Sequence, residues 1–369
     1  MKCTCSRSDL NDALNAVSRA VAVKSATPIL GGIYLRAEGN TLELQSTNYQ
    51  LGVIAKIPAN VERDGATVVI GKYFSSVVQK FSGEIVTISD EDDSSKATLK
   101  SEAASFDLLT MDADDFPRVK KENLLQSFRV QSGVLKNLIG RTVFACGSDQ
   151  TRPAFTGCLI EVFGTNINFV GTNAHRIAIA KDKIFDESPD FKLVIPAYTL
   201  RNLLAMLAGV KDSVVTIDFS GSDVAFSFEN VFVSSRLIDG AFPSYEKVIP
   251  EYCETTAIVE VAELRAALER MQIIASETEY KTVVFSFTQD GLEIISRSNE
   301  IGRSTEHVDA EVSGSDIEMA FNIIYLQEAL KIIGSSKLKI GMNQALSPVD
   351  IRGLDDDSFI YIITPLRTQ

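Results

Sequence analysis

The sequence predicts an α+β protein with three similar domains in a row, each with two helices packed on antiparallel sheets. The first observation is a short motif in which two strand-like runs flank a polar turn with an asparagine, a pattern typical of a hairpin. Its asparagines, Asn48, Asn173 and Asn299, are 125 and 126 residues apart. The second is a Phe-Pro pair that recurs after 126 residues, at Phe116-Pro117 and Phe242-Pro243. A fixed period of this kind indicates one structural unit repeated three times.

The length of 369 residues agrees with this division, because a chain of this length normally folds around more than one hydrophobic core. We expect linkers near residues 122–127 and 251–256. The predicted domains are therefore residues 1–127, 128–253 and 254–369.

The first domain is predicted to contain the same helix-plus-strands motif twice. Residues 6–24 form the first helix, because Leu10, Leu14 and Val17 recur at helical spacing and a serine can cap its start. The second helix covers residues 72–81 and ends before Gly83. The strands are expected at residues 30–37, 41–46, 50–57, 85–89, 96–100 and 105–110, with residues 90–94 as a polar hairpin tip.

The other two domains repeat this order. Their helices are expected near residues 132–147, 197–211, 261–276 and 322–337. The last strand, residues 359–363, runs into a tail that contains Thr364-Pro365-Leu366-Arg367.

Composition places the chain among ordinary globular proteins of the cytoplasm. The apolar fraction is 45%, the charged fraction is 23%, and no apolar run is long enough to cross a bilayer. We therefore expect no membrane partner and no signal peptide. The five cysteines have no framework spacing, so we interpret them as reduced thiols and expect no metal and no cofactor.

The charge is unevenly distributed between the helices and the rest of the chain. The net charge is −13, yet the six predicted helices carry thirteen Lys and Arg against five Asp and Glu. Lys and Arg are good helix formers at exposed positions, which is the alternative explanation. A positive helical surface in an acidic protein instead indicates weak, sequence-independent contact with the phosphates of duplex DNA. On helix charge alone the candidates are Arg19, Lys80, Lys136, Arg141, Arg201, Arg265 and Arg270.

Catalytic motifs are incomplete, so we do not expect an enzyme. The sequence has only two histidines, His175 and His307, for a histidine-based triad. Residues 65–72 imitate a phosphate-binding loop but have the wrong glycine spacing, and Tyr73 stands where a hydroxyl for magnesium is needed. Ser244 and Lys247 have Ser-x-x-Lys spacing without the helix that this chemistry requires. A hydrolase or nucleotidyl enzyme and a repeat scaffold that binds only proteins remain as alternatives.

The residues Thr172-Asn173-Ala174-His175-Arg176-Ile177-Ala178, Asp239-Gly240-Ala241-Phe242-Pro243-Ser244-Tyr245, Thr27-Pro28-Ile29-Leu30-Gly31 and Thr364-Pro365-Leu366-Arg367 together resemble the bacterial DNA polymerase III beta subunit, or beta sliding clamp, over the whole chain. The resemblance implies three clamp domains per chain and a head-to-tail homodimer closed into a ring. It also implies that helices line a hole around duplex DNA while sheets form the outer wall. The expected function is that of a processivity factor in DNA replication. The implied partners are duplex DNA, the replicative DNA polymerase alpha subunit, the clamp loader and other proteins with a clamp-binding motif.

The resemblance further implies a peptide-docking pocket between the second and third domains. Its residues would be Phe155, Thr172, Ala174, His175, Arg176, Ile177, Pro243, Lys247, Val248, Ile362, Thr364, Pro365, Leu366 and Arg367. The apolar members would form the floor, while Arg176 and the hairpin backbone would hold polar peptide groups. Ala174 stands where relatives commonly have glycine, and Thr364 where they commonly have a large apolar residue.

The resemblance also assigns residues to DNA and to the dimer contact. Lys24, Lys72 and Arg152 would lie near the hole, whereas Tyr73, Ala197 and Tyr198 stand where basic residues often occur. In the dimer, Phe74, Phe106 and Leu108 of one copy would face Ile273 and Ile274 of the other.

Overall fold

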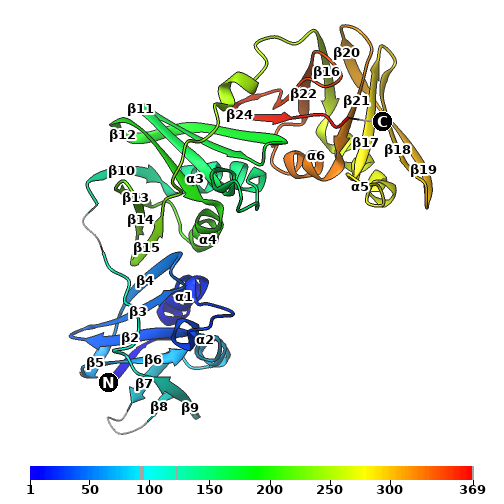
Figure 1. Ribbon diagram of the computed structural model, residues 1–369. Helices are drawn as coiled ribbons and strands as arrows, with labels where there is room; N and C mark the ends of the chain where they lie inside the picture. The colour runs from blue at the N-terminus through cyan, green and yellow to red at the C-terminus, as the bar shows by residue number, and fades with distance from the viewer. Residues whose placement is uncertain (91–94, 122–123, 368–369) are drawn as a thin grey trace. The chain divides into compact units, whose positions relative to one another are not determined.

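The computed structural model describes residues 1–90, 95–121 and 124–367 (Figure 1). Every predicted helix is present in this part of the chain. The α-helices are α1 (Arg7–Val17), α2 (Gly71–Lys80), α3 (Ser132–Thr142), α4 (Ala197–Leu207), α5 (Val261–Ala275) and α6 (Ile323–Leu330). All of them pack with antiparallel sheets, so the predicted fold class is confirmed.

The chain divides into two compact units, which are described separately. The first contains Met1–Leu135, Ile184–Asp186 and Tyr198–Leu237; the second contains Lys136–Lys183, Glu187–Ala197 and Ile238–Gln369. The division passes through the second sequence repeat, so each unit contains part of it.

The first unit is built on one antiparallel sheet of thirteen described strands. In spatial order these are β10 (Gln126–Gln131), β13 (Val214–Phe219), β14 (Asp223–Phe228), β15 (Val231–Arg236), β4 (Leu51–Pro58), β3 (Thr41–Thr47), β2 (Gly32–Glu38), β6 (Gly65–Ile70), β9 (Ala104–Met111), β8 (Lys96–Ser101), β7 (Ile85–Asp90), β1 (Lys2–Ser6) and β5 (Asn60–Arg63).

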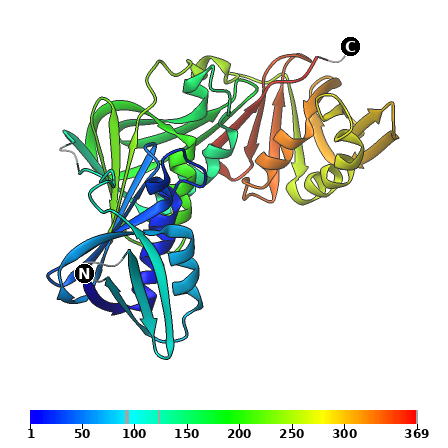
Figure 2. The same ribbon diagram turned by 60° about the horizontal axis from the view of Figure 1, so that its bottom comes forward.

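Helices α1 and α2 lie side by side against this sheet, as Figures 1 and 2 show in blue. Ser6 caps α1 by accepting a 3.4 Å hydrogen bond from the backbone N–H of Asp9, as predicted. Leu14 and Phe74 face inward and are 1% and 0% exposed, so the two apolar faces share one core. Beyond α1, a 3₁₀ turn over Ser18–Ala20 contacts α2 through a 3.0 Å bond between two serine hydroxyls.

The second unit contains two antiparallel sheets. In order, the seven-stranded sheet has β11 (Gly157–Thr172), β12 (Arg176–Pro196), β24 (Asp356–Ile363), β23 (Val349–Gly353), β22 (Lys337–Met342), β16 (Thr255–Glu260) and β20 (Ala310–Ser313). The four-stranded sheet has β19 (Gly302–Val308), β18 (Gly291–Ser298), β17 (Thr282–Thr288) and β21 (Ile317–Asn322).

Helices α5 and α6 also lie side by side (Figure 1, yellow and orange). At their contact the amide N–H groups of Gln327 donate to the carbonyl of Leu268 at 3.1 Å and to the side-chain oxygen of Gln272 at 3.2 Å. These bonds satisfy a polar group that is only 7% exposed. The helix pair of the third repeat therefore packs as α1 and α2 do in the first.

The hairpin tips show the repeat in atomic detail. Tyr49 has φ 68° and Ala174 has φ 75°, so both occupy the left-handed region. In each tip the asparagine side chain accepts backbone hydrogen bonds two and three residues ahead, at 3.1 and 2.9 Å for Asn48 and at 3.0 and 3.2 Å for Asn173. The threonine before each asparagine accepts a third bond. The glycine that relatives commonly have in place of Ala174 agrees with this geometry.

The strands that follow these tips continue the sheet into the next repeat. Strand β4 pairs with β15 so that Leu51 faces Ser235, and β12 pairs with β24 so that Arg176 faces Ile363. Leu51 and Arg176 are both three residues beyond their asparagine. We call the pairing of β4 with β15 the first junction and the pairing of β12 with β24 the second junction. Counted from the asparagine of the tip, the two junctions have the same register.

The helices are less basic than predicted because they are shorter. Within the bounds given above they carry eight Lys and Arg against five Asp and Glu. Helix α1 ends at Val17, so Lys24 lies outside it in an exposed loop. The predicted excess of charge thus belongs partly to the segments that follow the helices.

The left-handed conformation of Ala174 makes a stability prediction. We expect Ala174→Gly to raise the free energy of unfolding by about 1 kcal/mol, because relief of strain exceeds the entropy that glycine adds to the unfolded chain. The matched control, Ala262→Gly on the exposed face of α5, should lower it by about 1 kcal/mol. Urea unfolding of both variants measures the two changes. A loss of stability in Ala174→Gly would contradict the argument.

Candidate functional site

The structure brings several of the predicted docking residues into one apolar cluster. Ile177 on β12 and Ile362 on β24 face each other across the second junction and are buried. Val248, in the 3₁₀ turn Tyr245–Val248, packs against this cluster and is only partly buried. Ile238, Phe242 and Ile249 of the same connecting segment also pack against it, and the sequence argument did not include them among the docking residues.

The C-terminal tail is fixed beside the hairpin tip by backbone hydrogen bonds. The N–H of Thr364 donates to the carbonyl of His175 at 2.9 Å, and the N–H of Leu366 donates to that of Ala320 at 2.7 Å. Leu366 remains partly exposed, whereas Pro365 is buried. The tail therefore contributes one accessible apolar side chain next to the tip.

Phe155 belongs to the same surroundings through its backbone. The N–H of Gly147 donates to the carbonyls of Phe155, at 2.7 Å, and Thr172, at 3.3 Å. The Phe155 ring is partly buried, and the Arg152 guanidinium lies 5.2 Å from its centroid. The exposed predicted residues around this area are Ala174, His175, Pro243, Lys247, Thr364 and Arg367.

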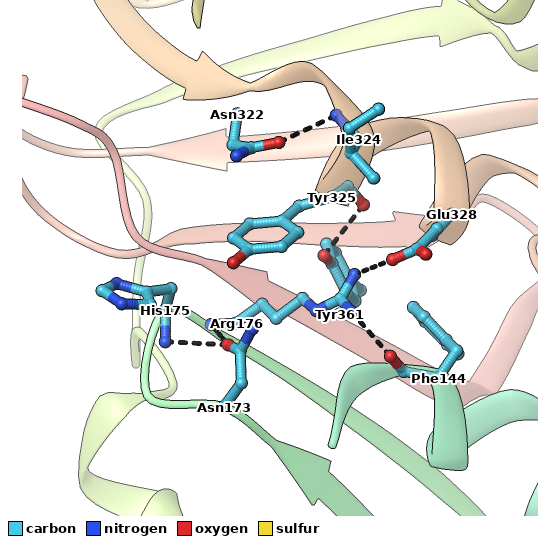
Figure 3. A network of polar contacts seen from close by, with 9 residues as sticks. All are labelled: Phe144, Asn173, His175, Arg176, Asn322, Ile324, Tyr325, Glu328 and Tyr361. Atoms are coloured by element: carbon cyan, nitrogen blue, oxygen red, sulfur yellow. Dashed lines mark hydrogen bonds and ion pairs between the residues drawn. The ribbon is translucent and has the colours of Figure 1, made fainter. Parts of the chain in front are cut away.

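Arg176 does not have the free guanidinium that the sequence argument expected. Figure 3 shows its side chain enclosed by Phe144, Tyr325 and Glu328, and it is 6% exposed. The guanidinium carbon lies 5.2 Å from the ring centroid of Phe144 and 4.3 Å from that of Tyr325. One nitrogen donates to the Phe144 carbonyl at 2.6 Å, and another is ion-paired with Glu328. The guanidinium of Arg176 is therefore engaged within the chain beside the hairpin tip. The prediction that it is free to hold polar peptide groups is corrected.

Tyr361 completes this support. Its hydroxyl donates to the carbonyl of Tyr325 at 2.9 Å (Figure 3), and burial raises the pKa of the phenol above its ordinary value despite the nearby Arg176. No sequence pattern pointed to Phe144, Tyr325 or Glu328, because their proximity to Arg176 arises only when distant segments pack together.

A second buried polar contact holds the connecting segment in place. Tyr245 donates to Glu161 at 2.5 Å, and Lys192 pairs with the same carboxylate at 2.5 Å. Burial and the hydrogen bond to the carboxylate raise the pKa of Tyr245. Glu161 is 1% exposed, so these two partners compensate a charge that would otherwise be costly to bury.

The predicted DNA contacts fall into two groups. Arg19, Lys24, Lys72 and Lys80 are exposed near α1 and α2, and no ion pair involves them within the described part of the chain. Arg201 is also exposed and Lys136 is half-buried. The first four therefore give the helical side of the first unit a positive charge.

The other predicted cations have partners in their own chain. Arg141 is ion-paired with Asp356 and stacks on Phe359 at 5.2 Å, so its predicted availability to phosphate is corrected. Burial alone would raise the pKa of Asp356, but hydrogen bonds from Ser358 and Arg141 hold it below its ordinary value. Three exposed cations also have acidic neighbours: Arg152 with Asp149, Arg265 with Glu269 and Arg270 with Glu306.

The residues predicted to form the dimer contact differ in their exposure. Phe74 is 0% exposed in the core of its own unit, so the prediction that it contacts a second copy is wrong. Its helical spacing reflected core packing. Phe106 and Ile273 are 45% and 73% exposed, while Leu108 and Ile274 are partly buried.

The acidic stretch Asp112, Asp114 and Asp115, which could resemble a cation site in the sequence, contains a turn. The N–H of Asp114 donates to the carboxylate of Asp112 at 2.9 Å, which is an Asx-type turn. Within residues 1–90, 95–121 and 124–367, no group of three or more His, Cys, Asp or Glu is placed to hold a metal ion. In the same ranges no helix is both long and apolar enough to cross a bilayer.

Comparison with known proteins identifies the family. Residues 1–120, 129–244 and 246–367 match the N-terminal, central and C-terminal domains of the DNA polymerase III beta subunit, in that order. The chain belongs to this family. Beta sliding clamps of Synechocystis and Bacillus subtilis are each 29% identical to it; the alignments cover 100% of this chain and 99% and 100% of those proteins.

Solved structures of beta subunits have the same fold. The sliding clamp of Bacillus subtilis superimposes with a TM-score of 0.94 at 28% identity, and the beta subunit of Thermotoga maritima with 0.94 at 26%. Both alignments cover 100% of each chain. The beta-subunit fold therefore extends over the whole chain, including the hairpin tip, connecting segment and tail described above.

In this beta subunit, the buried Arg176 makes the stability of the hairpin depend on Glu328. We expect Glu328→Gln to lower the free energy of unfolding by about 1–2 kcal/mol, because a guanidinium that is 6% exposed loses its counter-charge. Glu328 is 37% exposed, so water limits the loss. Glu318→Gln, at an exposed position on β21, is the control and should change stability by less than about 0.5 kcal/mol. Equal urea midpoints for both variants would refute the assignment.

Proposed function

We propose that this chain acts as a DNA sliding clamp, a processivity factor that encircles duplex DNA and keeps the replicative polymerase on its template. The observation that supports this function most directly is the match to three successive beta-subunit domains over nearly the whole chain. We place the domain boundaries at residues 1–127, 128–253 and 254–369. Proteins that bind only protein partners would not need the exposed cations near α1 and α2.

The ring would be a head-to-tail homodimer joined through sheet edges. Strand β9 pairs with β8 over Ala104–Leu109, and only Thr110 and Met111 pair with β6, so most of its second edge is open among the described strands. Strand β19 is the last strand of its sheet and has another open edge. Phe106 and Leu108 on β9 and Ile273 and Ile274 on α5 supply apolar surface near these edges. Joining the edges of two copies would satisfy their backbone groups.

The contact with DNA would be weak and directed at phosphates. Arg19, Lys24, Lys72 and Lys80 are the strongest candidates because they are exposed, whereas Arg141 is held by Asp356. Arg152, Arg201, Lys136, Arg265 and Arg270 remain secondary candidates. So few cations per helix would allow a closed ring to move along the duplex.

The area around the hairpin tip would dock short peptides of client proteins. Phe155, Val248 and Leu366 offer partly exposed apolar surface, and Pro243 and His175 lie at its edge. The DNA polymerase alpha subunit, the clamp loader and other proteins with a clamp-binding motif are the proposed clients. We assign no catalytic step to the chain.

Retention on DNA tests the proposed function. The loaded protein should remain on closed circular duplex DNA and be lost when the circle is cut, because enclosure rather than affinity holds it. Ile273→Asp should give a monomer of 40.3 kDa by light scattering and abolish retention, since a charge would enter the proposed contact. Leu354→Asp, at an exposed apolar site outside both proposed edges, is the control and should remain dimeric. Equal retention on linear and circular DNA would exclude a clamp.

The proposed cations can be tested by salt dependence. Lys24→Glu combined with Lys72→Glu should weaken binding to duplex DNA and reduce the slope of log affinity against log salt by about two, since each lysine releases roughly one counterion. Lys100→Glu, on the exposed face of β8, is the control for a single charge reversal elsewhere and should leave the slope nearly unchanged. An unchanged slope in the double variant would remove both lysines from the DNA contact.

Leu366 tests peptide docking. We expect Leu366→Ala to weaken a peptide from the polymerase alpha subunit by about tenfold or more, because its exposed apolar area is buried on binding. Leu354→Ala, at the opposite end of β24, is the control. Fluorescence anisotropy gives both affinities, and light scattering confirms that the dimer is intact. Equal affinity for the two variants would place the peptide elsewhere.

A further inference from the structure

A groove of about 490 Å³ lies at the first junction, where β4 pairs with β15. We call it the first-junction groove. Its sides are formed by the two strands and by residues 117–120 and Leu124 of the segment that follows the first repeat. Gly52 allows this segment to approach closely, because a Cβ there would lie 2.7 Å from the Ser234 hydroxyl and 2.9 Å from Val119. All of these residues belong to the first compact unit.

This groove corresponds, position by position, to the docking surface proposed at the second junction. The shared hairpin geometry places Thr47, Tyr49 and Gly52 where the second junction has Thr172, Ala174 and Ile177. The shared strand register places Ser234 and Arg236 where it has Ile362 and Thr364. Pro117 corresponds to Pro243 through the repeat of the Phe-Pro pair. Repetition of the fold has therefore placed a groove beside the first hairpin tip and an apolar cluster beside the second.

The side chains of the first-junction groove favour a different ligand. Gly52 and Ser234 replace the two isoleucines of the second junction, so the surface is more polar. Arg118, Lys120 and Arg236 are exposed around it, and Asp223 is the one carboxylate that lines it in the described residues. No ion pair involves Lys120 or Arg236 in the described part of the chain.

We propose that the first-junction groove is a second docking site, which takes an acidic peptide segment in an extended conformation. The cations complement carboxylates of the peptide, and the small apolar area formed by Val119, Leu124, Ala225 and Phe232 receives one aliphatic side chain. The proposal goes beyond the clamp function and does not depend on peptide docking at the second junction.

Tyr49, which lines the first-junction groove, supplies an independent reason to assign a binding role to it. Its ring is 66% exposed, and its backbone has φ 68°, where a bulky residue is strained. Glycine would fit this turn with less strain, so the exposed ring is kept at a cost in stability. A single exposed ring is too little for a stacking platform, so the groove fits a peptide better than single-stranded nucleic acid.

Subtractive selection tests the proposal with the full dimeric protein. A display library of random decapeptides is selected on the wild-type protein and then screened for loss of binding to the Lys120→Glu/Arg236→Glu variant. The second junction is intact in both proteins, so peptides that bind only there bind both proteins equally and are discarded. We expect a set of peptides rich in Asp and Glu, each with one aliphatic residue, whose affinity falls about tenfold in the variant. Lys100→Glu is the control for a single charge reversal elsewhere and should retain them, and each of Lys120→Glu and Arg236→Glu alone should weaken them.

The location and class of ligand are checked separately. Methyl NMR signals of Val119, Leu124 and Ala225 should shift with the selected peptides, while those of Val248 and Ile362 should not. Three outcomes would overturn the proposal: no peptide depends on Lys120 and Arg236, the dependent peptides lack acidic residues, or oligothymidylate binds the groove more tightly than they do. Failure of the clamp function would appear instead as loss of retention on circular DNA, with these signals unaffected.

Discussion

Pairing between strands of successive repeats is the constraint on which the rest of the structure depends. At each junction the strand after a hairpin tip bonds to the last strand of the next repeat, β4 to β15 and β12 to β24. A slip of one residue would turn every side chain of the strand to the other face of the sheet, so the buried apolar residues fix the register. The tip, the connecting segment and the strand ends are then held in a defined arrangement. The first-junction groove and the apolar cluster of the second junction both lie beside such a pairing.

The features that local chemistry determines could be predicted from the sequence. An asparagine that bonds its own backbone two and three residues ahead forms the same turn wherever it occurs, so the repeated Thr-Asn pair identified both tips correctly. The helices followed from apolar spacing, but α1 ended earlier than expected because no local signal marked the 3₁₀ turn after Val17. Phe74 shows the limit of such patterns: helical spacing identifies a face that is buried, but not whether its own core or a second chain buries it.

The burial of Arg176 could not be predicted from the sequence, for a different reason. Its partners Phe144 and Glu328 are separated from it by 32 and 152 residues, and the contact forms only after the second and third repeats have paired. Charge counts treat each arginine alike, yet Arg141 and Arg176 are engaged within the chain while Lys24 and Lys72 are exposed. Burial and pairing, which are properties of the folded state, decide which cations can meet a ligand.

The two junctions show how repeated backbone geometry can serve different partners. Ile177 and Ile362 meet across the second junction and pack under the connecting segment, which leaves a shallow apolar surface. The equivalent pair at the first junction, Gly52 and Ser234, has almost no apolar volume, so the connecting segment approaches the strand and an open polar groove remains beside it. Because the backbone register is the same, the difference in ligand chemistry comes from the side chains alone. Repetition thus fixes the backbone geometry of the two junctions, and substitution at a few facing positions determines the chemistry of the surface beside each.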